Sequence, residues 1–239
     1  MARDFDGVDD NISFGSDASI DNFPTATNGA TCAMWLRADT PDIAFQVLVD
    51  KTPTGITGWR PMNWETFNEP DRLQCSAGWT GGADLTNWYA ENAPGAVWKH
   101  VVAQYNANAT TNDPLIFING TSQTITEITP APSGTWEPDA GANLILGWDN
   151  SSSAGNSYDG GAAAFCYDNT QWTAAAINRA RWWGRPHGGL QVYHPLWTTK
   201  VANEGSATAN GTVTGATMIS SPIPVVRPGT AMMGMEIGW

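Results

Sequence analysis

Hydrophobic and polar positions alternate over short stretches of this chain, and clusters of Gly, Asn, Asp and Pro separate the stretches. A period of two residues is typical of β-strands with one buried face. The pattern predicts strands at Asp4–Phe14, Thr31–Ala38, Ala44–Asp50, Met62–Phe67, Arg72–Trp79, Trp98–Asn106, Leu115–Asn119, Gln123–Ile128, Leu144–Trp148 and Gly161–Tyr167. Asn119 and Gly120 predict a tight hairpin between two of them, because this pair readily adopts positive φ angles.

Only the stretch TAAAINRARWWG has helical character. Thr173 is its N-cap, Ile177, Ala180 and Trp183 share one side, and Gly184 ends it. One short helix among so many strands predicts an all-β sandwich of two antiparallel sheets rather than alternating β-α-β units.

The composition changes after Gly184, where the strand pattern weakens. We therefore predict a sandwich over residues 1–184 and a C-terminal extension over residues 185–239. The end of this extension, Met218–Trp239, is rich in Pro, Met and Gly and almost uncharged. A segment so apolar is expected to pack on the sandwich or on a partner subunit as an irregular arm.

The charge of the chain excludes several functional classes. It carries 23 acidic and 11 basic residues, a formal net charge of −12, and no basic run, which argues against nucleic-acid binding. No apolar stretch is long enough to span a membrane, and the opening MARDFDGVDD lacks the apolar core of a signal peptide. Cys32, Cys75 and Cys166 form no disulfide framework, so we expect folding in a reducing cytoplasm.

Four stretches carry a family resemblance: FDGVDDNISF from Phe5, ATCAMWLRA from Ala30, the pair WKHVVAQYNA and LIFINGT from Trp98, and LILGWDN with the strand and helix that follow. In this order they resemble the laminin-G-like branch of the concanavalin A-like lectin/glucanase superfamily. The resemblance implies a jelly-roll sandwich of two antiparallel sheets with one short helix.

The C-terminal part has a second resemblance. VYHPLW from Val192 and GTVTGAT from Gly211 are similar to segments attached to such domains in phage structural proteins, although GSATANG only approximates the stretch that usually precedes the second motif. This resemblance implies a virion protein that decorates the capsid or is associated with the tail. Its expected partners are the major capsid protein, tail components and further copies of itself, after folding in the host cytoplasm.

The sequence contains few of the residue patterns that known catalytic sites require. Glycoside hydrolysis needs two carboxylates across the scissile bond, and only ETFNEPD, Glu65 to Asp71, gathers acids on a strand. Their order differs from the Glu-x-Asp-x-x-Glu of the laminarinase-type branch. His100, His187 and His194 have no Ser or Cys partner at motif spacing. We therefore expect no enzyme.

Calcium is an open alternative, because laminin-G-like relatives often hold this ion at loops of one sandwich edge. Oxygen-rich clusters of the kind that suit a hard cation occur at Asp9 to Asn11, at Glu69 and Asp71, and in WDNSSSAGNSYDG. The last gives Asp149, Asn150 and Asp159 as the calcium candidates. The same residues also stabilise turns without any ion.

Thirteen tryptophans remain to be placed. Those in strand or helix patterns are expected in the core: Trp35, Trp98, Trp148, Trp182 and Trp183. Those among Asn, Thr and Gly are the candidate contact residues: Trp59, Trp64, Trp79, Trp88 and Trp136. Such rings anchor protein interfaces, stack on sugars, or simply add to the core.

The leading interpretation is a non-enzymatic phage virion protein acting through protein contacts. The alternative is a lectin-like module that recognises a surface polysaccharide.

Overall fold

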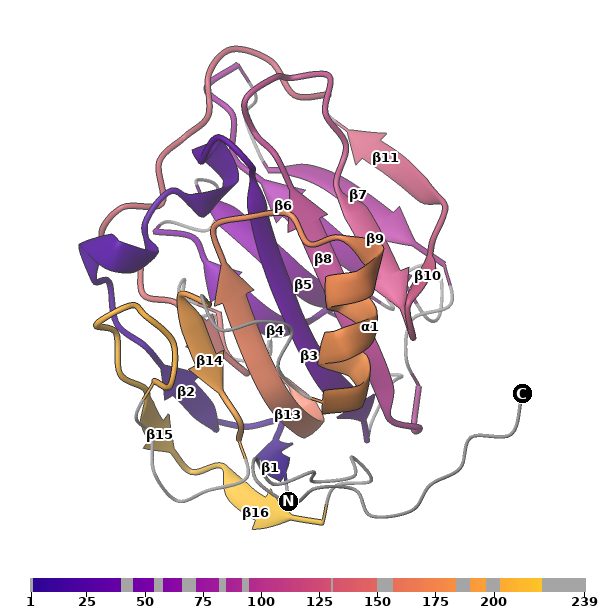
Figure 1. The fold of residues 1–239 in the computed structure, drawn as a ribbon, viewed down its shortest axis with the longest axis vertical. Coiled ribbons are helices and arrows are strands. Elements are labelled where there is room, and N and C mark those ends of the chain that lie inside the picture. Colours follow the sequence, from indigo (N-terminus) through magenta and orange to yellow (C-terminus); the bar gives the residue numbers. More distant parts are fainter. Residues whose placement is uncertain are drawn as a thin grey trace.

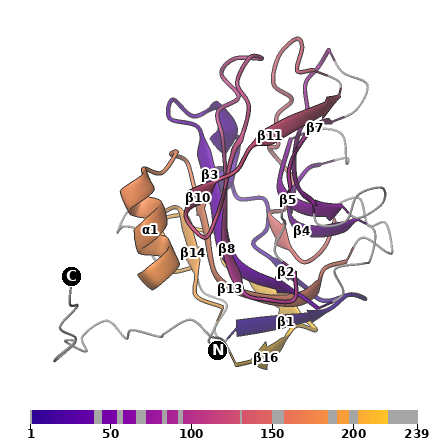
Figure 2. The ribbon, with the colours of Figure 1, turned by 90° about the vertical axis from the view of Figure 1, so that its right-hand side faces the viewer.

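The computed structural model describes residues 2–39, 45–53, 58–65, 72–81, 85–91, 95–129, 131–149, 157–183, 190–196 and 203–220. For Asn63, Trp64, Glu65, Thr129 and Trp183 it describes the backbone alone. Two β-sheets lie face to face, with one helix on the outer side of the first sheet (Figures 1 and 2).

The first sheet has the strand order β10-β9-β8-β3-β13-β1-β16, with β14 also beside β13. Its strands are β1 (Ala2–Asp6), β3 (Ala30–Ala38), β8 (Lys99–Tyr105), β9 (Leu115–Ile118), β10 (Thr121–Ser122), β13 (Asp159–Asp168), β14 (Val192–His194) and β16 (Thr217–Ile219). All these pairings are antiparallel, as the resemblance implies.

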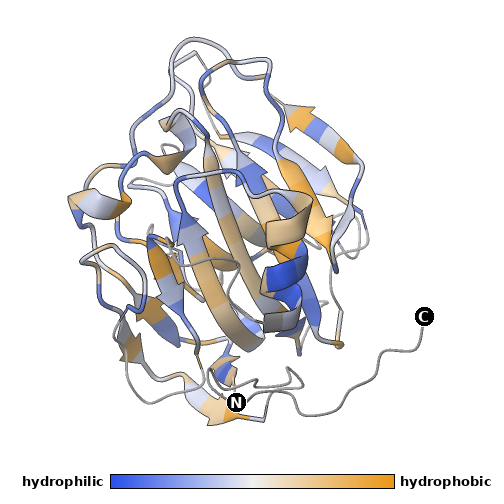
Figure 3. Ribbon diagram, in the orientation of Figure 1, coloured by the Kyte–Doolittle hydropathy of each residue, from blue (hydrophilic) through white to orange (hydrophobic). Residues whose placement is uncertain are grey.

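The second sheet has the order β11-β7-β6-β5-β4-β12-β2-β15, and its pairings are also antiparallel. Its strands are β2 (Asn11–Ser13), β4 (Gln46–Lys51), β5 (Trp59–Glu65), β6 (Arg72–Ala77), β7 (Thr86–Ala90), β11 (Ile125–Thr129), β12 (Ile145–Leu146) and β15 (Thr212–Thr214). The period of two is seen on β7, where buried and half-buried residues alternate. Figure 3 shows β11 with hydrophobic residues on either side of a hydrophilic stretch. The predicted two-sheet sandwich is confirmed.

The predicted helix is confirmed as α1 (Ala174–Trp183), and Thr173 caps it by accepting a hydrogen bond from the N–H of Ala176 at 3.3 Å. Ile177 and Ala180 are buried against the outer face of the first sheet. Trp182, by contrast, is 57% exposed, so its predicted place in the core is wrong. Two short 3-10 turns, η1 (Ala18–Ile20) and η2 (Phe23–Thr25), complete the described elements. No helix among the described residues is both long and apolar enough to cross a bilayer.

Several parts of the strand prediction differ from the structure, among them β7 (Thr86–Ala90), where no strand was predicted. The stretch Asp4–Phe14 forms two strands in different sheets, because Gly7 has a φ of +73° and turns the chain between β1 and β2. The C-terminal part also contributes strands: β15 pairs with β2, and β16 pairs with β1. The chain therefore adds an edge strand to each sheet after residue 211, where the sequence pattern indicated only weak strands.

A buried ion cluster joins the N-terminal turns to the segment before β12. The ammonium of Lys51 lies 2.8 Å from Asp21 and 3.6 Å from Asp139, and it also donates to the carbonyl of Ala142 at 3.1 Å. One Asp139 oxygen accepts the N–H of Asn22 at 2.6 Å. Burial is the dominant effect on Asp139 and raises its pKa to about 6, although Lys51 opposes this shift.

We expect the Asp139→Asn variant to change how stability depends on pH. The folded-state pKa of Asp139 lies above its unfolded value, so its contribution favours folding below about pH 4 and is lost as the pH rises through about 6. The free energy of unfolding of the native chain should fall relative to that of the variant across this window, by up to about 3 kcal/mol. Urea unfolding of both proteins between about pH 4 and pH 7 measures this difference. Parallel stability curves would contradict the assignment.

Candidate functional site

Four of the five candidate contact tryptophans come together around one tyrosine. Trp88 and Trp59 lie with ring centroids 5.3 and 6.4 Å from that of Tyr105, and Trp136 lies 6.4 Å from it. Trp79 meets Trp136 edge to face, at 6.1 Å and 88°. Burial raises the pKa of the Tyr105 hydroxyl, and the neighbouring Trp79 side chain partly offsets this shift. We call Trp59, Trp79, Trp88, Tyr105 and Trp136 the aromatic cluster.

Most of this cluster is core, which corrects the predicted surface position of its members. Trp59 and Trp88 are 0% exposed, because they occupy inward positions of β5 and β7, and Trp79 is 3% exposed. The Asn, Thr and Gly neighbours that indicated loops belong to strands or to tight connections. Trp136 is half-buried at the edge of the cluster, and the side chain of Trp64 lies outside the described residues.

A short backbone ladder fixes the outer pair, Trp79 and Trp136. The N–H of Thr80 donates to the carbonyl of Thr135 at 3.0 Å, and the N–H of Glu137 donates to the carbonyl of Gly78 at 3.1 Å. The N–H of Thr135 in turn donates to the Thr80 hydroxyl at 3.0 Å. Residues 78–81 and 133–137 thus pair across the end of the sandwich.

Two glycines allow this close approach. A Cβ on Gly81 would lie 2.8 Å from the backbone of Ser133, and a Cβ on Gly134, whose φ is +82°, would lie 2.9 Å from the N atom of Gly81. Both contacts are shorter than real Cβ atoms tolerate. The glycines therefore serve the tertiary pairing of these two segments.

An open groove of about 500 Å³ runs beside this ladder. We call it the tryptophan groove. Trp79, Gly134, Thr135 and Trp136 line one wall, and residues 107–111 line the other. The second wall belongs to the loop between β8 and β9, at the end of the sandwich drawn at the top of Figure 1.

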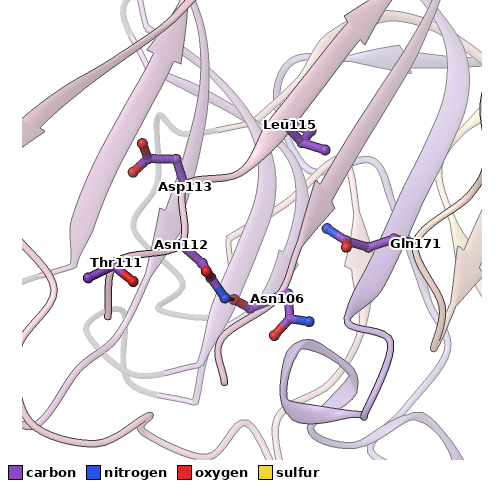
Figure 4. A pocket seen from close by; sticks show the side chains of 6 residues that line it. All are labelled: Asn106, Thr111, Asn112, Asp113, Leu115 and Gln171. Atoms are coloured by element: carbon purple, nitrogen blue, oxygen red, sulfur yellow. Dashed lines mark hydrogen bonds between the residues drawn. The ribbon is translucent and has the colours of Figure 1, made fainter. Parts of the chain in front are cut away.

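A second open groove, of about 440 Å³, lies at the same loop (Figure 4). We call it the amide groove, because three of its lining side chains are amides. It is lined by Asn106, Thr111, Asn112, Asp113, Leu115 and Gln171. Thr111 lines both grooves, so they adjoin at the tip of the 106–113 loop.

Side-chain hydrogen bonds hold the 106–113 loop in shape. The Asn106 side chain accepts the N–H of Asn108 at 3.0 Å, and the Asn112 amide donates to the Asn106 carbonyl at 2.9 Å. Asp113 accepts the indole N–H of Trp88 at 2.9 Å, which ties the loop to the aromatic cluster. Both grooves therefore have preformed walls.

Several polar groups in the grooves remain available to a ligand. Within the described part of the chain, the side chains of Thr110, Thr111 and Gln171 make no hydrogen bond. Two hydroxyls and one amide supply both donors and acceptors. Together with the half-buried ring of Trp136, they give a surface that combines hydrogen bonding with an apolar face.

Two of the predicted calcium residues belong to the described part of the chain. Asp149 is buried, and its carboxylate lies 3.1 Å from the guanidinium of Arg60, with which it forms an ion pair. Asn150 lies outside the described residues. Asp159 is half-buried in β13, where its N–H donates to the Gln46 side chain at 2.8 Å.

Another acidic group, Asp6, Asp9 and Asp10, has carboxylate oxygens within 4.8 Å of one another. Asp6 accepts the N–H of Val8 at 2.9 Å, and Asp10 accepts the N–H of Asp6 at 2.9 Å. These bonds are those of a turn, in keeping with the turn-forming alternative for Asp9 to Asn11.

The histidines and cysteines of the described residues lie in the interior. Burial, with a smaller effect of Arg181, lowers the pKa of His100 to about 3, so this strand residue is neutral at physiological pH. His194 is buried and accepts the N–H of Leu196 at 3.1 Å. Cys32, Cys75 and Cys166 are free and buried. His187, the side chain of Glu65 and residues 66–71 lie outside the described part of the chain.

Comparison with solved structures defines the class of fold. A crystal structure from Bacteroides ovatus, of a protein whose carbohydrate-binding role is itself an assignment, aligns with a TM-score of 0.64 and 15% identity. The alignment covers 94% of this chain and 61% of that chain, so the present chain spans less than two thirds of the neighbour. The fold is thus a jelly-roll β-sandwich of the kind found in carbohydrate-binding domains.

More distant neighbours have related descriptions. The CBM40 domain of the Ruminococcus gnavus IT-sialidase aligns at a TM-score of 0.49 and 11% identity, over 76% of this chain and 98% of that chain. A botulinum neurotoxin binding domain aligns at 0.45 and 11% identity, over 64% and 34% of the two chains. No protein-family model and no curated protein sequence matches the chain.

Proposed function

We propose that this chain is a non-catalytic carbohydrate-binding domain that holds a glycan at the loop end of the sandwich. The observation that carries the proposal is the tryptophan groove. There the half-buried Trp136 lies opposite a loop whose Thr110 and Thr111 hydroxyls have no partner among the described residues. A sugar offers an apolar face to an aromatic ring and hydroxyls to polar groups, so this combination suits it.

The fold adds support of a second kind. The neighbour from Bacteroides ovatus that shares the fold over 94% of this chain is assigned to carbohydrate binding. Fold similarity alone does not determine function, so the site carries the proposal. The absence of a signal for catalysis in the sequence also favours binding over hydrolysis.

A glycan array tests this proposal with the full chain. We expect the labelled protein to bind a restricted set of glycans. Binding should be equal with and without EDTA, because the described residues that line the two grooves include no cluster of carboxylates that could hold a metal ion. Binding that disappears with EDTA would favour the calcium alternative. A chain that binds no glycan would overturn the proposal.

A role in the phage virion, through contacts with capsid or tail proteins and with further copies of the chain, is a second proposal that rests on sequence resemblance. The structure assigns the two motifs behind it to β14 and β15, which extend the sheets. The apolar segment from residue 221 onward lies outside the described residues. Mass spectrometry of purified virions for this chain tests the proposal.

A further inference from the structure

The two grooves together indicate which class of glycan the site accepts. The inference rests on the proposed carbohydrate-binding function and deepens it. Its starting point is Thr111, which lines both the tryptophan groove and the amide groove, so a ligand in one reaches the other over a single residue. Each groove falls within the range of roughly 300–1,000 Å³ that is usual for small-molecule sites.

The second observation is the charge of the walls. None of the described residues that line either groove is Lys, Arg or His, and the one ionisable side chain among them is the carboxylate of Asp113. This carboxylate is exposed and accepts the indole N–H of Trp88. The chain as a whole also has a net charge of −12. Recognition of a sugar carboxylate or sulfate normally uses cationic or clustered N–H donors, and like charges at close range repel.

The third observation is the type of polar group on offer. Thr110, Thr111 and Gln171 present hydroxyls and an amide that have no partner within the described residues, and these groups match sugar hydroxyls in both donor and acceptor capacity. Figure 4 shows Gln171 on the opposite side of the amide groove from Asp113 and Thr111. The amide groove therefore offers contacts of its own and extends the surface beyond Trp136.

From these three observations we infer that the site binds an uncharged oligosaccharide along both grooves, with one sugar against Trp136 and the following sugars over Thr111 toward Gln171. Glycans that end in a carboxylated sugar are excluded, because the carboxylate would lie near Asp113 without a cationic partner. Affinity should then increase with the number of sugar units until both grooves are filled.

Isothermal titration calorimetry of the full chain tests this inference. The probes are β-1,4-linked glucose, mannose and xylose oligomers from disaccharide to hexasaccharide, with oligogalacturonides of the same lengths and the pair lactose and sialyllactose. In at least one neutral series we expect the affinity to rise about tenfold or more from disaccharide to tetrasaccharide. Sialyllactose should bind at least about tenfold more weakly than lactose, and oligogalacturonides at least about tenfold more weakly than the best neutral oligomer of the same length. A tenfold difference in affinity corresponds to 1.4 kcal/mol.

Two glutamine variants provide a matched comparison. Gln171→Ala should remove most of the gain in affinity that the longer oligomers show over the disaccharide. Gln123→Ala makes the same change in a separate groove of about 240 Å³, lined by Glu91 and residues of the β10–β11 region. This control variant should bind both the disaccharide and the longer oligomers like the native chain. Circular dichroism and thermal unfolding of both variants verify that the fold is retained.

The outcomes separate the inference from the proposed function. Affinity that is independent of length, or insensitive to Gln171→Ala, overturns the two-groove site while glycan binding itself stands. Preference for an acidic probe overturns the exclusion of charged sugars in the same way. Failure of every probe to bind overturns both the inference and the function on which it rests.

Discussion

Glycan binding should be nearly abolished in the Trp136→Ala variant. Truncation of a central aromatic contact in a binding site commonly costs about 2 kcal/mol or more, which corresponds to roughly a 30-fold loss of affinity. Trp136 is the member of the aromatic cluster that is half-buried and lines the tryptophan groove, whereas Trp59 and Trp88 are fully covered. Titration with the best glycan from the array measures the effect.

Two further variants control this experiment. Trp136→Phe retains a ring against Trp79 and should keep part of the affinity. Trp182→Ala removes a tryptophan that is 57% exposed on α1, away from both grooves, and should bind like the native chain. Equal losses for Trp136→Ala and Trp182→Ala would contradict a site at Trp136. Thermal unfolding shows whether a loss of binding reflects a loss of fold.

Replacement of Arg60 by Met should cause the largest loss of stability. The guanidinium lies 3.2 Å from the Asp50 carboxylate and 3.1 Å from that of Asp149, and all three side chains are at most 5% exposed. Removing the Arg60 cation leaves the buried carboxylates of Asp50 and Asp149 without this ion-pair partner. Breaking a buried ion pair in this way typically costs about 3–5 kcal/mol. Urea unfolding at neutral pH measures the cost.

The matched control is Arg37→Met, which removes a more exposed ion pair with Asp39 and should cost less than about 1 kcal/mol. Equal losses for both Arg variants would contradict the buried cluster.

Local patterns predicted the sandwich because short apolar or alternating runs between turn residues are typical of strands. β7 buries alternate positions, and β4 is buried throughout. The patterns could not predict which strands meet across the chain. β16 pairs with β1, and the short, Thr-rich segments of β15 and β16 carry too few apolar positions to stand out. Hydrogen bonds to strands at the other end of the chain hold them in place.

The site shows a different limit. Sequence patterns group Trp79 and Trp136 as candidate contact residues, and both line the tryptophan groove. The same patterns place Trp59 and Trp88 at the surface, because their neighbours resemble those of loop residues. Only the folded chain reveals that Tyr105 gathers these rings. One signal was available: GWTGG and SGTW each place Gly beside Trp and Thr, and glycine is the residue that close backbone pairing requires here. Thr111 and Gln171 have no such signal.

The pairing of β16 with β1 and of β15 with β2 has a consequence for folding during synthesis. Arg3 donates a buried hydrogen bond to the carbonyl of Ala216, a residue 213 positions later. While the chain is being synthesised, β1 and β2 each keep one edge without its final neighbour until the ribosome has released β15 and β16. Contacts so distant in sequence close slowly, since much chain entropy is lost first. The nascent protein therefore exposes one unpaired edge of β1 and one of β2, the kind of surface that chaperones cover, until β16 and β15 pair with them.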